Sequence, residues 1–125
     1  MATVKSSTDL EQSKKLAKIL PLESADNVIV SFGSREGTKT VVMPKETLDV
    51  IRTPFDDIRE TTMCWSLAAL FGILPILDNR SPVIAKTFDG KYRVTYHSTA
   101  YEKAILTSDY DNPIDACVEM IEKLN

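Results

Sequence analysis

Cys64, His97 and Asn112 are the residues of this chain whose types could support nucleophilic catalysis. In such a reaction a cysteine thiolate attacks a carbonyl carbon, an imidazole takes the thiol proton, and an amide or carboxylate orients the imidazole. His97 is the only histidine of the chain, so it would have to act as the base. Asn112 or the adjacent Asp111 would orient its ring. These residues form the one candidate set for a cysteine hydrolase.

The activity of Cys64 depends on the structure around it. Segment 62–74 is apolar at nearly every position, Thr61 or Thr62 could cap its start, and Gly72 with Pro75 stops it. The pattern predicts a central helix that is covered on most sides. Cys64 would then lie in the first turn, where the positive end of the helix dipole lowers the pKa of a thiol.

A Cys64-Trp65 pair at a helix start, followed by a sheet that bears His97, resembles the arrangement in papain-like and peptidoglycan-cleaving cysteine hydrolases. The glycine-rich approach to the cysteine is replaced here by Glu60-Thr61-Thr62-Met63. Burial in an apolar helix would also raise the thiol pKa, and free cysteine is among the most buried residue types. We therefore predict that Cys64 is a small core side chain and keep the hydrolase as an alternative.

Length and composition indicate one globular domain. The chain has 125 residues, of which 43% are hydrophobic and 26% charged, and its formal net charge is −3. These values exclude a disordered or collagen-like chain and give no general attraction to phosphate backbones. We expect a disordered N-terminus over 1–7 and a single α+β domain over 8–125.

The cysteine count and the N-terminal residues bear on redox state, metals and location. Cys64 and Cys117 both lie on apolar patterns, so we expect them to be reduced and buried. One histidine and two separated cysteines supply no zinc spacing, and we expect neither metal nor cofactor. The sequence shows no secretory leader and no apolar run long enough for a membrane span, which favours a cytoplasmic protein with no membrane partner.

The first half of the chain is predicted to form a helix, a β-hairpin and a short helix. Thr8-Asp9-Leu10-Glu11 matches a capping box for a helix that ends at Pro21. Alternating residues predict strands over 27–32 and 38–43, and a short helix follows around 46–52. The apolar stripe of the first helix would be Leu10, Leu16, Ala17, Ile19 and Leu20, and the later anchors to the core Leu48, Ile51, Phe55 and Ile58.

The second half is predicted to form a three-stranded antiparallel meander and a terminal helix. Strands over 83–88 and 92–97 flank Asp89-Gly90, which favours a two-residue turn with positive φ at both positions. A third strand returns over 101–106. Asn112 as N-cap, followed by a proline, begins a helix whose apolar face is Ile114, Cys117, Val118, Ile121 and Leu124.

The order helix, three strands, helix is also that of double-stranded RNA-binding domains. Those domains resemble one another in placing lysines at the start of the last helix, whereas this chain has Asp109, Asp111 and Asp115 there. Tyr92 and Tyr96 could stack on bases, but their alternation with polar residues favours a core role. Nucleic-acid binding on the exposed face of the C-terminal sheet is therefore a further alternative that charge disfavours.

Three segments together resemble a family of small uncharacterised proteins encoded by phages and mobile elements of gut bacteria. The segments are 10–26, 64–70 and 111–121, which carry cap and core signals. The resemblance implies no reaction and no site residue. It favours an accessory protein that is not an enzyme and acts through contact with a protein partner whose identity the sequence does not give.

Overall fold

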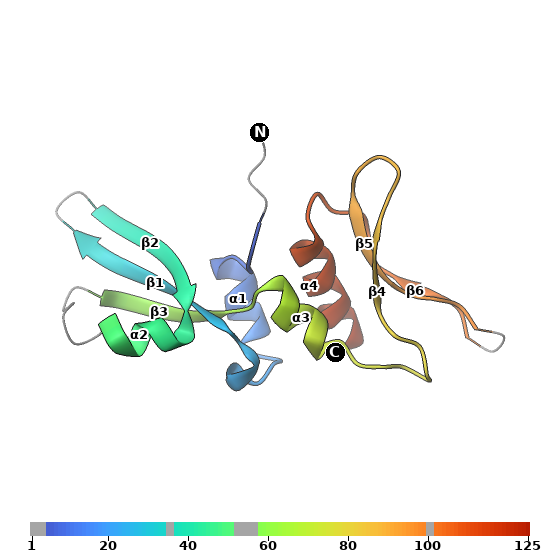
Figure 1. Cartoon of the computed structure of the whole chain (residues 1–125), viewed down its shortest axis with the longest axis horizontal. Helices are drawn as coiled ribbons and strands as arrows, with labels where there is room; N and C mark the ends of the chain where they lie inside the picture. Colours follow the sequence, from blue (N-terminus) through green and yellow to red (C-terminus); the bar gives the residue numbers. More distant parts are fainter. Residues whose placement is uncertain (1–4, 35–36, 52–57, 100–101) are drawn as a thin grey trace. The chain divides into compact units, whose positions relative to one another are not determined.

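The computed structural model describes residues 5–34, 37–51, 58–99 and 102–125, and it has the α+β fold that the sequence predicts (Figure 1). Within these residues four α-helices accompany two antiparallel three-stranded sheets. The elements in chain order are α1 (Leu10–Leu16), a 3₁₀ turn (Leu22–Ser24), β1 (Asn27–Ser34), β2 (Gly37–Pro44), α2 (Lys45–Ile51), β3 (Ile58–Cys64), α3 (Leu67–Ile73), β4 (Val83–Lys86), β5 (Tyr92–Tyr96), β6 (Ile105–Leu106) and α4 (Pro113–Leu124).

The chain divides into two compact units, and each contains one sheet. The N-terminal unit is Ser7–Ser66, and the C-terminal unit is Leu67–Asn125 together with Lys5 and Ser6. Residues 5–7, which the sequence assigns to a disordered N-terminus, instead make defined contacts. Lys5 forms an ion pair of 2.8 Å with Asp115, and Ser7 forms a β-bridge with Ser66.

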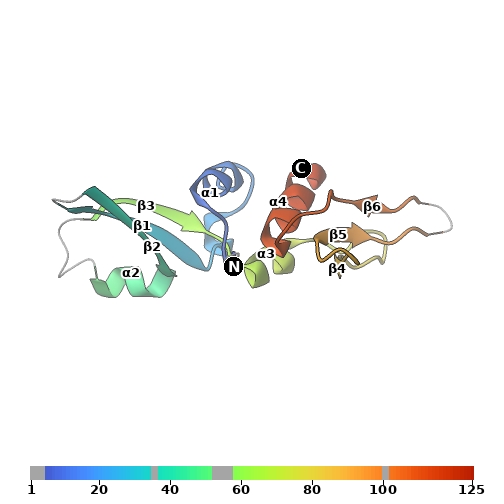
Figure 2. The ribbon, with the colours of Figure 1, turned by 90° about the horizontal axis from the view of Figure 1, so that it is seen from above.

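The N-terminal sheet has the strand order β2-β1-β3. β1 pairs with β2 as the sequence predicts, and the helix expected around 46–52 is α2. Helices α1 and α2 lie on opposite sides of this sheet (Figure 2). The α2 side forms a core of Val28, Val30 and Leu48, against which Phe32, Met43, Ile58 and Met63 pack. Of the other predicted anchors, Phe55 lies outside the described residues.

The predicted helix over 62–74 is wrong at its start. Residues 62–64 end strand β3, and the helix begins only at Leu67. Thr62, Met63 and Cys64 pair with Ile29, Val28 and Asn27 of β1. The β1 pairing satisfies the backbone groups of this stretch, and its alternation buries Cys64 completely. Residues 62–64 begin the apolar run that continues into α3, and such a run is compatible with either a strand or a helix.

Helix α3 is also less covered than predicted. Only Leu70 is buried within it, and Phe71 is 36% exposed. Trp65, which lies before the helix and belongs to the N-terminal unit, is by contrast fully buried. Its indole Nε1 donates a hydrogen bond to Ser24 Oγ at 3.0 Å.

The first helix begins one residue later than predicted. Asp9, not Thr8, is the N-cap: its carboxylate accepts from the Gln12 N–H at 2.8 Å, and the Gln12 side chain accepts from the Asp9 N–H. The Thr8 hydroxyl instead accepts from the backbone N–H of Trp65. Of the predicted apolar stripe only Leu16 is fully buried and Leu20 is partly buried, whereas Leu10, Ala17 and Ile19 are exposed.

The C-terminal sheet has the order β4-β5-β6 and is the meander that the sequence predicts. Its first turn differs from the prediction. The Gly90 N–H donates to the Thr87 carbonyl, the Thr87 N–H donates to the Lys91 carbonyl, and of the two predicted positive-φ positions only Gly90 has one, at 84°. The loop therefore has three residues, with Gly90 in the left-handed conformation that such loops require.

The third strand and the last helix complete this unit. β6 covers only Ile105 and Leu106 of the strand predicted over 101–106, and residue 101 lies outside the described ranges. Helix α4 begins as predicted, with the Asn112 side chain accepting from the Asp115 N–H. Its inward face is buried, including the predicted Cys117, and both cysteines are free and buried as expected.

Candidate functional site

Strand β5 places two different sets of side chains on the two faces of the C-terminal sheet. Val94 and Tyr96 are fully buried on the face that contacts α4. The Tyr96 hydroxyl donates to the Pro75 carbonyl at 2.7 Å, and burial raises the pKa of its phenol. Arg93, Thr95 and His97 alternate with these residues and therefore point to the opposite face, as the sequence predicts.

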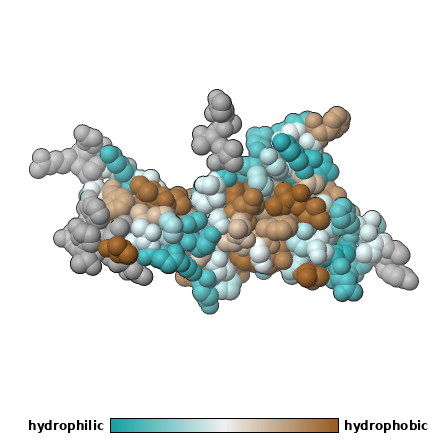
Figure 3. Space-filling model, in the orientation of Figure 1, coloured by the Kyte–Doolittle hydropathy of each residue, from teal (hydrophilic) through white to brown (hydrophobic). Residues whose placement is uncertain are grey.

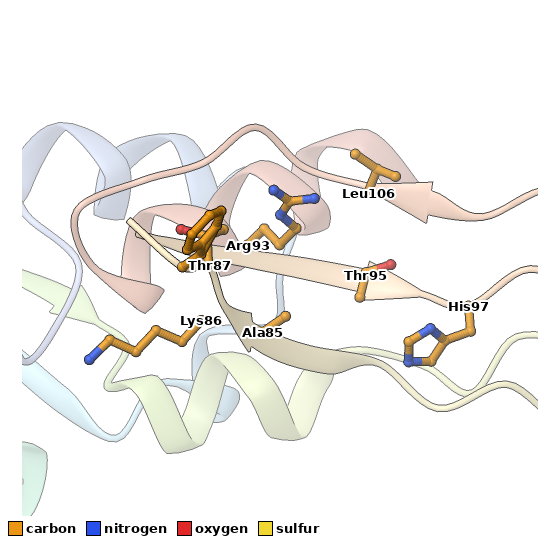
Figure 4. A pocket seen from close by; sticks show the side chains of 8 residues that line it. Ala85, Lys86, Thr87, Arg93, Thr95, His97 and Leu106 are labelled. Atoms are coloured by element: carbon orange, nitrogen blue, oxygen red, sulfur yellow. The ribbon is translucent and has the colours of Figure 1, made fainter. Parts of the chain in front are cut away.

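The opposite face contains an open hollow of about 440 Å³ (Figure 4). Apolar side chains contribute to its lining, and among them Leu106 is 45% exposed and Phe88, at the tip of the β4–β5 loop, is fully exposed. Sticks in Figure 4 show Arg93, Thr95 and His97 arrayed along β5. The lining residues are Ala85, Lys86, Thr87, Phe88, Arg93, Thr95, His97 and Leu106.

The charged groups around the hollow are held in place by partners. Arg93 Nε lies 2.9 Å from Asp109 Oδ1, and its Nη2 donates to Asp109 Oδ2 at 3.2 Å. Lys86 lies over the Tyr92 ring, 5.7 Å from its centroid. The Thr87 hydroxyl donates to Asp89, which lowers the pKa of that carboxyl. Because Lys86 is the register partner of Tyr92, its ammonium lies on the other face of the sheet. The hollow therefore presents the Arg93 guanidinium, oriented by Asp109, beside apolar side chains.

Arg80 anchors the loop that follows His97, and sequence analysis missed it. Its side chain is only 8% exposed, and Nη1 donates to the carbonyls of His97 and Lys103 at 3.0 and 3.1 Å. Nη2 forms an ion pair with Glu102. Hydrogen bonding to Asp78 raises the pKa of Glu102. The backbone of His97 is thus fixed at the rim of the hollow.

A tight turn positions Arg80. The N–H of Leu77 and the N–H of Arg80 each donate to the other's carbonyl, and Asp78 and Asn79 between them have φ of 48° and 63°. Asp and Asn tolerate this left-handed conformation better than other non-glycine residues. The Asp78-Asn79 dipeptide was therefore the sequence signal for this turn.

Cys64 lies in a different setting from the one that the sequence predicts. It ends strand β3, and α3 begins only at Leu67, so Cys64 does not lie in the first turn of a helix. Burial raises the pKa of the Cys64 thiol to about 11, and a hydrogen bond with Ser7 offsets only part of this effect. A thiol in this state is protonated at neutral pH and is a poor nucleophile.

The partners proposed for Cys64 belong to the other unit. His97 follows β5 and is exposed, and its ring lines the hollow. Asn112 is occupied as the N-cap of α4: its Oδ1 accepts from the Asp115 N–H at 2.9 Å, and its Nδ2 donates to the Asp115 carboxylate at 2.8 Å. Asp111 forms an ion pair of 3.2 Å with Lys91. The structure therefore gives Asn112 and Asp111 local partners other than an imidazole.

The described residues contain no group of three or more His, Cys, Asp or Glu side chains that could hold a metal ion. No helix in the same part of the chain is long and apolar enough to cross a membrane. Comparison with protein-family models, curated proteins and solved structures finds no match to this chain.

Proposed function

We propose that this chain is a small non-enzymatic cytoplasmic protein, of the phage or mobile-element type, that acts by binding a partner protein. The observation that carries the proposal is the asymmetry of the C-terminal sheet. Val94 and Tyr96 are fully buried on its α4 face, whereas its other face carries a hollow with exposed apolar side chains and the oriented Arg93 guanidinium.

The apolar and charged side chains on this face indicate the kind of partner that would bind to it. Leu106 and Phe88 offer apolar area that becomes buried on contact, and the Arg93 guanidinium, oriented by Asp109, offers positive charge beside it. Partner segments that combine large apolar residues with Asp or Glu match both features, because charge complementarity sets orientation while apolar contact supplies affinity. We therefore propose an acidic, apolar protein segment as the occupant.

The state of the predicted catalytic residues supports a role without catalysis. Burial holds the Cys64 thiol protonated, and Asn112 is used to cap α4. If this is correct, Cys64→Ser retains binding, and a thiol reagent labels the native protein slowly until a denaturant is added. Labelling of the native protein as fast as that of the unfolded chain would instead support the hydrolase.

A selection from a random peptide library displayed on phage tests the proposed partner class. With the purified full chain as bait, we expect enrichment of peptides that contain both acidic and large apolar residues. The double substitution Thr95→Asp and Leu106→Asp should abolish enrichment, since it places negative charge in the hollow. The matched control Val50→Asp changes a valine that is 74% exposed in the N-terminal unit and should leave enrichment intact.

Two results would contradict the proposal. The first is a selection that enriches no acidic peptide, or one in which the hollow variants behave like wild type. The second is a gel shift of single-stranded RNA or DNA at low salt that disappears at high salt. That outcome would favour the nucleic-acid alternative on the same face, because binding through phosphate contacts weakens steeply with salt.

A further inference from the structure

The outer edge of β2 in the N-terminal sheet has the features of a strand-pairing site. β2 is an edge strand of eight residues in the order β2-β1-β3, and no described strand lies beyond it. Val41 is 45% exposed and Val42 47% exposed, one on each face of the sheet. A long edge strand with exposed apolar residues readily adds another strand.

The register shows which backbone groups of β2 point outward. The Lys45 N–H donates to the Asp26 carbonyl at 3.2 Å, and this bond joins the residues that flank the pair Asn27 and Pro44. That pair is therefore of the type without mutual hydrogen bonds, and such pairs alternate along an antiparallel ladder. Since the β1–β2 register runs without a shift, Val42 and Thr40 belong to the same type. Their N–H and C=O groups face away from β1.

The two edge strands of this sheet differ in how far they are protected from pairing with another strand. At the β3 edge, Ser7 bridges Ser66 and the Thr8 N–H donates to the Trp65 carbonyl at 2.9 Å, which covers the end of that side. β3 also carries the exposed charges Arg59 and Glu60, which discourage pairing. Among the described residues of β2, Lys39 is the only charged side chain. The β2 edge is therefore the one suited to another strand.

We propose that β2 pairs antiparallel with β2 of a second copy of this chain, about a two-fold axis at Val41. In this register Thr40 lies opposite Val42 of the partner subunit, and the outward N–H and C=O groups of each pair bond to one another. Val41 lies against Val41 of the partner subunit, so the exposed valines become buried. Lys39 lies opposite Met43 of the partner subunit and not opposite a second lysine.

A second copy fits this edge because the arrangement is self-complementary. An interface about a two-fold axis requires that one surface match itself. Here the exposed Val41 meets a second valine, and Lys39, the one charged residue of β2, does not meet a second lysine. The continuous six-stranded sheet would join two N-terminal units through their edges. The proposal is independent of the proposed function, which uses the other sheet.

The oligomeric state of the full chain in solution tests the proposal. We expect sedimentation velocity over a series of protein concentrations to show a reversible monomer–dimer equilibrium. Val41→Lys should raise the dissociation constant about tenfold or more, since it places two like charges directly opposite each other. The control Ile19→Lys, at a residue of similar exposure (40%) in the same unit, should leave the constant unchanged.

Two further variants make the test specific for this register. Val42→Pro removes an outward N–H that the sheet itself does not use, so it should prevent dimers while circular dichroism stays unchanged. Pro44 already occupies the equivalent position on the same strand. A mixture of Val41→Lys with Val41→Glu should restore dimers that neither protein forms alone.

Three outcomes would overturn the proposal. If the wild-type protein is monomeric at every concentration, no second copy pairs with β2. A dimer that persists in both Val41→Lys and Val42→Pro must use another surface. A charge-swapped mixture that remains monomeric excludes a two-fold axis at Val41.

Discussion

Both sheets of this protein are antiparallel and three-stranded, but they differ in which part is exposed. The N-terminal sheet has helices on both sides, and its central strand has three consecutive buried residues, Val28, Ile29 and Val30. The C-terminal sheet is packed on one side, and β5 alternates between buried and partly exposed residues. Both sheets also carry apolar side chains at the surface, as Figure 3 shows for one side of the molecule. A continuous apolar run thus marks the sheet that is open only at an edge, and alternation marks the sheet with an open face.

A reciprocal substitution at the centres of the two sheets should have the largest effect. Ile29→Thr introduces into the N-terminal sheet a threonine, the residue that the C-terminal sheet has at position 95. It should lower the free energy of unfolding by about 2–4 kcal/mol, because Ile29 is only 4% exposed and a buried hydroxyl without a partner adds to the lost apolar contact. Thr95→Ile in the C-terminal sheet should change it by less than about 0.5 kcal/mol, since that side chain reaches the open face.

Denaturant unfolding followed by circular dichroism measures both changes. Ile29→Val is the control, and it should cost about 1 kcal/mol because it removes a methylene without adding a polar group. Equal losses for Ile29→Thr and Thr95→Ile would show that the two sheets do not differ in coverage.

The elements that the sequence predicts well are those with a local signal. Asn112 caps α4 as expected because its side chain meets the N–H of a residue only three positions ahead. Gly90 marks the β4–β5 turn, although the loop has one more residue than predicted. Strand β3 carries no such signal, because its partner residues in β1 lie 26 to 37 positions earlier in the chain. Long-range pairing decided between strand and helix for residues 62–64.

The candidate site was predictable only in part. The alternation of β5 predicts that Arg93, Thr95 and His97 share a face, and the structure confirms it. The hollow itself also depends on Leu106 from a different strand, and Arg80 reaches the rim from a turn. These contributions come from packing between elements, which residue spacing along one strand does not encode.

Each unit contains one buried thiol, and the loss of stability that each thiol causes at high pH should be intermediate in size. Burial raises the pKa of Cys64 to about 11 and that of Cys117 to about 12, from an ordinary value of 9.0. Because each folded pKa is raised, the associated stability is complete below pH 9 and is lost as pH rises toward the folded value. Between pH 8 and pH 10 each thiol should lower the free energy of unfolding by about 1.4 kcal/mol.

Chemical denaturation at several pH values in this range, with a reducing agent present, measures the loss. Cys117→Ala should be less stable at pH 8, because it leaves a small cavity, and on going to pH 10 it should lose about 1.4 kcal/mol less stability than wild type. An unchanged pH dependence in this variant would show that the Cys117 thiol is not desolvated in the folded protein.

The N-caps of the two units should differ by the smallest amount. Asn112 is half-buried and caps a helix of twelve residues, whereas Asp9 is exposed and caps one of seven. We expect Asn112→Ala to cost about 1.5 kcal/mol and Asp9→Ala about 0.5 kcal/mol, because a solvated helix end can replace a lost cap with water. Unfolding of both variants beside Asn112→Ser, which keeps an acceptor and should recover most of the loss, measures the difference. Equal costs would mean that burial of the helix end adds nothing to the strength of its cap.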